Sequence, residues 1–481
     1  MNPKDIPDHI FRGYDLRGVC GVDLNEEILE LLGKGYATYL AQRRIKDCVV
    51  GMDNRLTSET YKNAFIKGLR SCGINVIDFN LGLAQIMYFA QYLYRTKGGA
   101  FITASHNPAN YNGMKLAVGF SQTMIFEEIQ ELKTITKSGD YALSNKEGTY
   151  KSVDIFQTYV EDIISRVQVG KKFKIVVDAS NTASGLFMPQ IFRKVGCEVI
   201  EQNCNLDGNF PNGTPDPTEV KIQERLAKRV VEEKADLGFS YDADGDRIGV
   251  VDEKGNLIWN DTLVSIFAID VLDYLPGSKI IFNTLCSKQV AEVIKIHKGI
   301  PIIWRTGHSF IKEKVAEERS PFGGELSGHF FFVDNFYGHD DGAFSSLRLL
   351  SYLERVSKPL SEVVSELPKY ISSPEIKVGC TDDSVKVRIV KNIAKIFKAD
   401  FPNAQITDDS IIPGDDGVRA DFDDGMIIFR YSQNGPYITV KFEAKDEKTF
   451  EERRKYVHQL LKRFPEMIWE GSNSVNLDFV K

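Results

Sequence analysis

Short apolar runs alternate with amphipathic stretches along most of this chain, and this pattern predicts alternating strands and helices. In the first part we expect strands at 47–51, 75–79 and 99–102, and helices at 26–39, 58–69 and 86–94. Ser58 is a candidate N-cap for the second of these helices. The order strand, helix, strand, helix, strand predicts parallel βαβ units.

The same pattern recurs twice and then changes. A second unit has expected strands at 173–178, 197–201 and 236–240, and a third has them at 279–282 and 302–304. From about residue 370, strands at 375–378, 425–429 and 438–442 accompany helices at 385–397 and 448–464. The chain therefore divides into three similar α/β domains at 1–150, 151–256 and 257–369, followed by a smaller α+β domain at 370–481.

Composition narrows the class of protein. The 481 residues are 42% hydrophobic and 26% charged, as in ordinary soluble globular proteins. The formal net charge of -7 and the lack of a Lys/Arg block argue against nucleic-acid binding. Because the N-terminal stretch lacks the order of a signal peptide and no apolar window approaches about 18 residues, we expect a cytoplasmic protein without membrane association. Seven scattered cysteines without a CxxC pair indicate neither disulfides nor a zinc site.

The stretch TASHNP at 103–108 follows the expected strand 99–102, so Ser105 lies where that strand ends. Pro108 and the Asn-Gly pair at 112–113 turn the chain back around the serine. His106 is its neighbour, and Lys115 opens the next apolar run. A hydroxyl beside two basic groups suits a phosphoryl acceptor, and a polar β-turn between two strands remains equally open.

A second focus is the acidic motif after strand 236–240, in which Asp242, Asp244 and Asp246 occupy alternate positions. Three adjacent carboxylates repel one another unless water or a cation neutralises them, and oxygen ligands favour Mg²⁺. An EF-hand is excluded because Arg247 stands where that loop needs glycine, and Gly245 and Asp246 do not fit a dehalogenase-type nucleophile motif. The alternative is a solvated acidic turn.

Two further segments hold candidate ligand-binding residues. Tyr14 and Arg17 lie in a glycine-flanked loop near the N-terminus, where glycines allow close approach to a ligand. His308 precedes Ser309, a candidate N-cap, and helix N-termini attract anions such as phosphate. A surface loop and a structural histidine are the respective alternatives.

Two glycine-containing loops complete the candidates. Glu325, Ser327 and His329 alternate along 321–330 and suit the vicinal hydroxyls of a sugar, although an ordinary hairpin is also possible. The loop 430–437 carries Arg430, Ser432 and Asn434 and suits a phosphate, with a plain Asn-Gly turn as the alternative.

With these motifs in this order, TASHNP, DADGDR, GGELSGH and Arg-x-Ser-x-Asn-x-Pro, the chain resembles the α-D-phosphohexomutases over essentially its whole length. Within that superfamily it is most similar to the phosphomannomutase/phosphoglucomutase branch. The resemblance implies four domains with mixed sheets, heart-shaped around a central cleft to which each contributes one loop. It also implies an isomerase acting on a small phosphosugar.

The implied mechanism starts from phosphorylated Ser105, with Mg²⁺ held by the phosphoryl group and the aspartates 242, 244 and 246. A hexose 1-phosphate binds on the loop of Arg430, its 6-hydroxyl attacks the phosphoserine, and a hexose 1,6-bisphosphate reorients before returning a phosphoryl group. The resemblance implies roles in substrate binding, charge stabilisation and proton transfer for the remaining residues. Glu325 and Ser327 hold the sugar 3- and 4-hydroxyls, Arg247 assists at the sugar or phosphate, and Arg17, His106 and Lys115 stabilise charge or move the proton.

The sequence departs from the family pattern at a few positions. Leu285 stands where a lysine is frequent, with Lys288 as a possible substitute, and Gln85 and Asn434 replace commoner residues. These departures concern the preferred sugar, mannose or glucose. A phosphoglucosamine mutase is disfavoured by the apolar Leu326, and a catalytically silent sugar-phosphate-binding relative is the alternative from another class. We expect a monomer or a homodimer.

Overall fold

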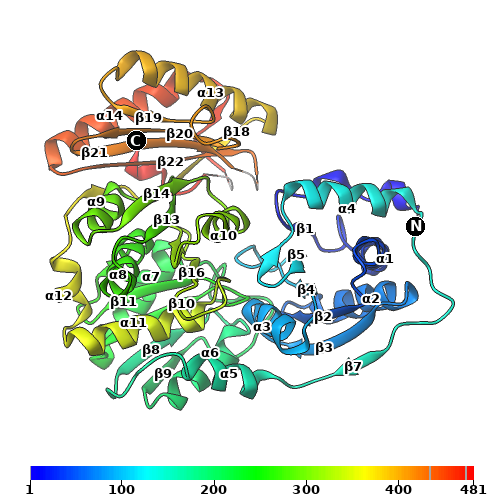
Figure 1. The fold of residues 1–481 in the computed structure, drawn as a ribbon. Helices are drawn as coiled ribbons and strands as arrows, with labels where there is room; N and C mark the ends of the chain where they lie inside the picture. Colours follow the sequence, from blue (N-terminus) through cyan, green and yellow to red (C-terminus); the bar gives the residue numbers. More distant parts are fainter. Residues whose placement is uncertain (1, 433–434, 472–473) are drawn as a thin grey trace. The chain divides into compact units, whose positions relative to one another are not determined.

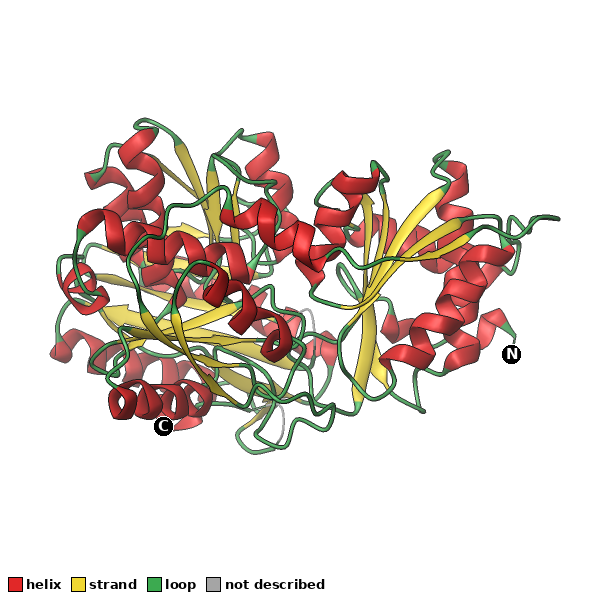
Figure 2. Cartoon of the chain, turned by 90° about the horizontal axis from the view of Figure 1, so that it is seen from below, coloured by secondary structure: helices red, strands yellow, loops and turns green. Residues whose placement is uncertain are grey.

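The computed structural model describes residues 2–432, 435–471 and 474–481. The described chain forms two compact units. The first contains the residues up to Asn260 together with Ser327–Ser365, and the second contains Asp261–Leu326 and Glu366–Lys481. Each sheet is covered by helices, as the strands and helices of Figure 2 make clear.

The first sheet is mixed, with the order β1-β5-β4-β2-β3-β7 and β6 paired to β5. Its strands are β1 (Leu16–Val19), β2 (Asp47–Met52), β3 (Asn75–Leu81), β4 (Gly98–Ile102), β5 (Tyr111–Gly119), β6 (Gln122–Thr123) and β7 (Tyr150–Ser152). The accompanying helices are α1 (Glu26–Gln42), α2 (Ser58–Ser71), α3 (Ala84–Tyr94) and α4 (Phe126–Ser138) (Figure 1). Strands β4, β2, β3 and β7 are parallel, which confirms the predicted βαβ units, whereas β5 runs antiparallel to β4.

Glycines allow α1 and α2 to pack closely over this sheet. A Cβ atom on Gly33 would lie 2.3 Å from the carbonyl oxygen of Phe65, and one on Gly68 would lie 2.2 Å from that of Glu30. The expected N-cap at Ser58 is wrong, because Thr57 occupies that position. The Ser58 hydroxyl instead donates to Asp53 Oδ1 at 2.6 Å, so it ties the helix to the end of β2.

The second sheet of the first unit has the order β12-β11-β10-β8-β9. Its elements are α5 (Phe156–Ile164), β8 (Lys174–Asp178), α6 (Ser184–Lys194), β9 (Glu198–Gln202), α7 (Val220–Glu233), β10 (Leu237–Tyr241), β11 (Ile248–Asp252) and β12 (Leu257–Ile258). Strands β9, β8 and β10 are parallel, and β11 returns antiparallel to β10. The unit also includes β16 (Phe330–Phe332), α11 (Gly342–Val356) and α12 (Leu360–Ser365).

The second unit begins with another α/β segment. Its elements are α8 (Asn260–Tyr274), β13 (Lys279–Asn283), α9 (Lys288–Ile296), β14 (Ile300–Trp304), α10 (His308–Glu317) and β15 (Phe322–Gly324). Strand β13 lies between β14 and β15 and is parallel to both. The carboxyl ends of the three strands therefore lie at one edge of the sheet.

The rest of the second unit is a layer of antiparallel strands with two long helices, which confirms the predicted α+β character. The elements are β17 (Ile371–Ser372), β18 (Ile376–Cys380), α13 (Asp383–Asp400), β19 (Gln405–Thr407), β20 (Gly417–Phe422), β21 (Gly425–Tyr431), β22 (Tyr437–Ala444), α14 (Glu447–Lys462) and β23 (Met467–Ile468). Both helices contribute to one hydrophobic core with β20, β21 and β22 (Figure 1). Three short 3₁₀ helices, at Pro3–Asp5, Asp8–Ile10 and Leu477–Phe479, lie near the chain ends.

Alternation along β22 separates two kinds of contact. Ile438, Val440 and Phe442 enter the helix-covered core. The intervening Lys441 points to the opposite face of the strand, where its ammonium group bonds Asp261 Oδ2 at 2.5 Å. The last sheet is therefore joined to the α/β segment of the same unit by a buried ion pair.

Across the described parts of the chain, the helices lack the combination of length and apolar character that crossing a bilayer requires.

The N-cap of α11 is a buried carboxyl group, that of Asp341. Asp341 Oδ1 accepts the Phe344 amide at 2.8 Å, and Tyr159 donates to Oδ2 at 2.7 Å. Burial raises the pKa of Asp341 from 3.8 to about 7. Between these two values the folded protein keeps a proton that the unfolded chain has lost, so this group's stabilising contribution falls as pH rises.

We predict that Asp341→Asn raises the melting temperature relative to the wild type more at about pH 8 than at about pH 5, because asparagine keeps the cap without a buried charge. Thermal melts at both pH values measure the difference, with Asp140→Asn at an exposed position as the control. An equal effect of Asp341→Asn at both pH values would contradict the prediction.

Candidate active site

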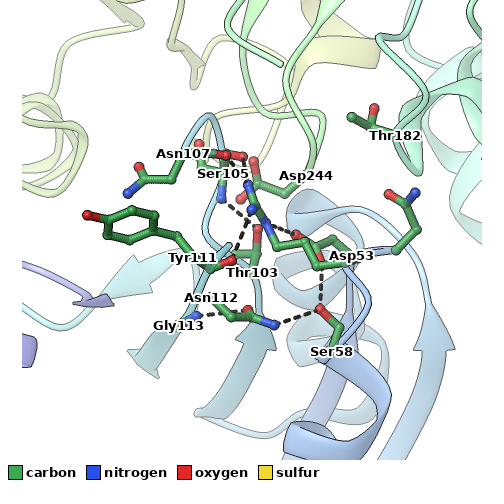
Figure 3. Close-up of polar contacts among 12 residues, drawn as sticks. Asp53, Ser58, Thr103, Ser105, Asn107, Tyr111, Asn112, Gly113, Thr182 and Asp244 are labelled. Atoms are coloured by element: carbon green, nitrogen blue, oxygen red, sulfur yellow. Dashed lines mark hydrogen bonds and ion pairs between the residues drawn. The ribbon is translucent and has the colours of Figure 1, made fainter. Parts of the chain in front are cut away.

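Ser105 lies in the loop that joins β4 to β5, where the sequence analysis placed it. Its residue is 1% exposed, and its hydroxyl donates to Asp242 Oδ2 at 2.8 Å. Its φ of 46° is in the left-handed region, which costs a non-glycine residue of the order of 1–3 kcal/mol. The Thr103 hydroxyl accepts the Ser105 amide at 2.8 Å and supports this conformation. Figure 3 shows Asp244 on the same side of the loop as Ser105.

The acidic motif lies in the corresponding loop of the second sheet, between β10 and β11. Carboxylate oxygens of Asp242, Asp244 and Asp246 lie within 4.8 Å of one another, and all three residues are buried. Burial and the neighbouring aspartates raise the pKa of Asp242 well above its usual range. The solvated acidic turn considered from the sequence is therefore not what forms.

Lys115 supplies positive charge to this cluster from β5. Its ammonium group lies 2.8 Å from Asp244 Oδ2 and also contacts Asp246 Oδ2. Burial alone would raise the pKa of Asp244, but Lys115 outweighs burial and lowers it. One lysine cannot balance three carboxylates, and the raised pKa of Asp242 reflects the repulsion that remains.

The acidic cluster fits a divalent cation. Asp244 Oδ1 and Asp246 Oδ1 are buried and accept no hydrogen bond among the described residues. Buried carboxylate oxygens without donors are what a hard cation would bind. Asp246, His329 and Asp340 form a second group with suitable spacing. In that group His329 Nδ1 is already 2.8 Å from an Asp340 oxygen, so the three aspartates are the better metal site.

Arg247 and His329 lie together beside the acidic cluster. Arg247 Nε donates to His329 Nε2 at 2.9 Å, and the Arg247 amide donates to Asp242 Oδ1 at 3.2 Å. Because Nε2 accepts a hydrogen bond, His329 carries its proton on Nδ1, facing Asp340. Asp340 was not identified from the sequence, because an Asp-Asp pair before a helix resembles an ordinary helix N-cap.

The other candidates of the first unit occupy varied positions. His106 Nδ1 is 3.3 Å from Ser105 Oγ, which makes it the nearest imidazole to the serine hydroxyl among the described contacts. Arg17 is 8% exposed on β1 and pairs with Asp15 at 2.8 Å. Tyr14 and Ser327 are partly buried. The structure thus brings Ser105, His106, Lys115 and the aspartates into one cluster from segments about 130 residues apart.

Within the second unit, His308 and Glu325 lie beyond the carboxyl ends of β14 and β15, respectively. Glu325 Oε1 accepts the Gly307 amide at 2.8 Å, and both His308 and Glu325 are buried. The expected N-cap at Ser309 is wrong, because α10 begins at His308 and Gly307 is its N-cap, with φ 134°. Ser309 instead lies within the first turn of the helix.

Arg430 and Ser432 lie at the end of β21, and Asn434 lies outside the described residues. Arg430 donates to Asp416 through Nε at 2.6 Å and Nη2 at 2.8 Å. This two-point pairing fixes the plane of the guanidinium group. Asp416 was not identified from the sequence, because no spacing rule connects it with Arg430.

Leu285 stands where a lysine is frequent in the family, and Lys288 was considered as its substitute. Lys288 donates its backbone amide to Glu443 Oε1 at 2.8 Å, and its ammonium group bonds the Phe422 carbonyl. Leu285 is buried, and its carbonyl oxygen lies 3.3 Å from the Lys441 ammonium group. The side chain of Lys288 is therefore directed to the strand β20.

Family models match three consecutive segments of the chain. They describe the α/β/α domains I, II and III of phosphoglucomutase/phosphomannomutase and match residues 8–142, 157–255 and 259–370. A phosphomannomutase/phosphoglucomutase of Pseudomonas putida is 37% identical over 97% of this chain and 98% of its own length. A phosphoglucomutase of Neisseria gonorrhoeae is 34% identical over 96% and 99%.

A solved structure agrees with these sequence relatives. The crystal structure of a phosphoglucomutase/phosphomannomutase family protein from Burkholderia thailandensis matches with a TM-score of 0.86 and 31% identity. The match covers 95% of this chain and 98% of that chain.

We predict that Asp244→Asn weakens Mn²⁺ binding about tenfold or more, because the cluster loses a carboxylate charge that faces the ion. Electron paramagnetic resonance of free Mn²⁺ in a titration measures the affinity. Asp140→Asn is the surface control, and Asp340→Asn tests the second group. Weaker binding by Asp340→Asn together with unchanged binding by Asp244→Asn would reject the assignment.

Proposed function

Because the chain belongs to the phosphoglucomutase/phosphomannomutase family, we propose that it interconverts hexose 1-phosphate and hexose 6-phosphate through a phosphoserine at Ser105. The observation that carries this proposal is the buried contact of Ser105 Oγ with Asp242, inside a cluster of three aspartates. A hydroxyl held beside a cation-binding cluster is what transfer of a phosphoryl group requires.

In the proposed reaction a sugar hydroxyl attacks the phosphorus of phospho-Ser105. The new bond joins phosphorus to the sugar oxygen, the bond from phosphorus to Ser105 Oγ breaks, and a hexose 1,6-bisphosphate results. Return of the other phosphoryl group reverses these changes at the second position of the sugar. We assign to His106 Nδ1, 3.3 Å from Ser105 Oγ, the movement of the proton: it takes up the proton of the attacking sugar hydroxyl and returns one to Ser105 Oγ as that oxygen departs.

Asp242, Asp244 and Asp246 would hold Mg²⁺, for which their oxygen-only composition is suited. When bound, Mg²⁺ would offset the charge of about -1.5 to -2 that phosphorylation brings to the serine. Lys115 and Arg17 stabilise the remaining charge on the transferring group, and Arg247 binds the sugar or its phosphate. Hexose 1,6-bisphosphate serves as intermediate and activator.

The remaining candidate residues would bind the sugar phosphate, as the family resemblance implies. Arg430, Ser432 and Asn434 bind the phosphate that is not being transferred. Glu325 and Ser327 bind the 3- and 4-hydroxyls, and Tyr14, His308 and His329 complete the set. None of these contacts involves the hydroxyl at C2, the position at which glucose and mannose differ. Both glucose and mannose phosphates therefore fit. The four loops belong to the domains 1–150, 151–256, 257–369 and 370–481.

We predict that Ser105→Ala abolishes the conversion of glucose 1-phosphate and mannose 1-phosphate, because the phosphoryl acceptor is removed while the fold is kept. Coupled assays primed with the matching 1,6-bisphosphate measure turnover, and glucosamine 1-phosphate tests the alternative sugar. Ser138→Ala, on the exposed end of α4, should leave activity intact. Full activity of Ser105→Ala would reject Ser105 as the phosphoryl acceptor. An inactive wild type would favour a catalytically silent sugar-phosphate-binding protein.

We predict that Arg430→Gln raises the KM for glucose 1-phosphate about tenfold or more, with a smaller effect on kcat, because a charged contact to the phosphate is lost. The control is Arg388→Gln, which removes a surface ion pair with Glu466 in the same unit. An unchanged KM for Arg430→Gln would contradict the assigned phosphate contact.

A further inference from the structure

The serine loop is the segment 103–111, which joins β4 to β5 and ends on the first residue of β5. Arg55 lies directly behind it, on the segment between β2 and α2. Strands β2 and β4 are parallel neighbours, so the chain leaving β2 runs beside the chain leaving β4 toward Ser105. The side chains of Arg55 and its partner Asp53 are completely buried. A buried guanidinium group is unfavourable unless its donors are all satisfied.

Every N–H donor of Arg55 has a partner, and most of the partners belong to the serine loop. The contacts are Nε to Asp53 Oδ2 at 3.1 Å, Nη2 to the carbonyl oxygens of Ser105 and Asn107 at 2.7 Å each, and Nη1 to those of Pro108 at 2.7 Å and Tyr111 at 3.0 Å. A guanidinium group has five donors in a fixed plane, so the set is complete. Lysine, with three donors and no plane, cannot reproduce it.

Asp53 is itself fixed, which makes Arg55 a rigid support. Asp53 Oδ1 accepts the Arg55 amide at 3.0 Å and the Ser58 hydroxyl at 2.6 Å. Asn112, at the start of β5, donates to the Ser58 hydroxyl at 3.1 Å. Figure 3 shows this chain of contacts from Asp53 through Ser58 to Asn112 beneath the loop, with Asp244 above it.

The contacts with Arg55 set the direction in which the loop presents its polar groups. Four carbonyl oxygens of the loop point inward to the guanidinium group, and the Ser105 hydroxyl points outward to Asp242. Carbonyl oxygens that faced outward would repel the oxygens of a phosphoserine at the same place. The left-handed conformation of Ser105 also needs external contacts to persist.

We propose that Arg55 is a positioning residue for the phosphoryl-transfer step, an inference that rests on the proposed function. It fixes the serine loop so that Ser105 Oγ meets the aspartate cluster and the loop carbonyls are kept away from the phosphoryl group. Arg55 does not touch the substrate in this role. Its removal should therefore lower kcat and leave KM nearly unchanged.

The test compares Arg55→Lys and Arg55→Met with the wild type on glucose 1-phosphate. We expect kcat to fall about 10²-fold, as small misplacements of reacting groups do, while KM stays within about twofold. Amide hydrogen exchange of residues 103–113 should become about tenfold faster, and exchange of α3 should not change. Arg70→Lys is the matched control, because Arg70 also bonds a carbonyl and a carboxylate, those of Gly148 and Glu147 in the segment before β7.

Other results would overturn the inference. An Arg55→Lys variant with the kcat and the loop exchange of the wild type would reject it, and so would a raised KM at unchanged kcat. If Arg55→Met fails to fold, Arg55→Lys and Asp53→Asn carry the test, and both should lower kcat. An inactive wild type would overturn the proposed function instead, and loop exchange in Arg55→Lys alone would then decide whether Arg55 holds the loop.

Discussion

Three aspartate carboxylates buried beside one another impose the strongest constraint on the first unit. Such an arrangement is unfavourable unless cations compensate it, because each charge loses its hydration and repels the others. Lys115 supplies part of the compensation from β5, and Arg247 adds charge near Asp242. The remaining negative charge explains why this cluster suits a divalent cation, and why a serine hydroxyl held at 2.8 Å from it suits phosphoryl chemistry.

The two loops that form this cluster arise from the same local topology. In each case a parallel strand, β4 or β10, ends in the loop, and the chain returns as an antiparallel strand, β5 or β11. The antiparallel return strand fixes both ends of the loop in the sheet, so the loop has little freedom. The loop between β4 and β5 is restricted further by a close approach of two backbones, since a Cβ atom on Gly113 would lie 1.9 Å from the Leu16 carbonyl oxygen.

Buried cations also hold loops in the second unit. Arg419 Nη1 donates to the carbonyl oxygens of Thr284 and Cys286, at 2.7 and 2.5 Å, and Lys441 lies 3.3 Å from that of Leu285. These contacts fasten the loop after β13 to β20 and β22. As with Arg55 in the first unit, buried basic side chains here donate to backbone carbonyl oxygens.

The sequence by itself determined the alternation of strands and helices, and the change near residue 370 from α/β to α+β organisation. It also determined the motifs around Ser105, Asp242, Glu325 and Arg430. These features are local, since periodicity and spacing act over a few residues. The structure alone decided which distant groups meet: Lys115 with Asp244, His329 with Arg247 and Asp340, and Arg55 with the serine loop. Such contacts depend on strand order and on side-chain direction across the sheet, which no local pattern records. The N-caps of α2 and α10 were misplaced for the same reason, because Asp53 and Glu325, from other elements, bind the Ser58 hydroxyl and the Gly307 amide.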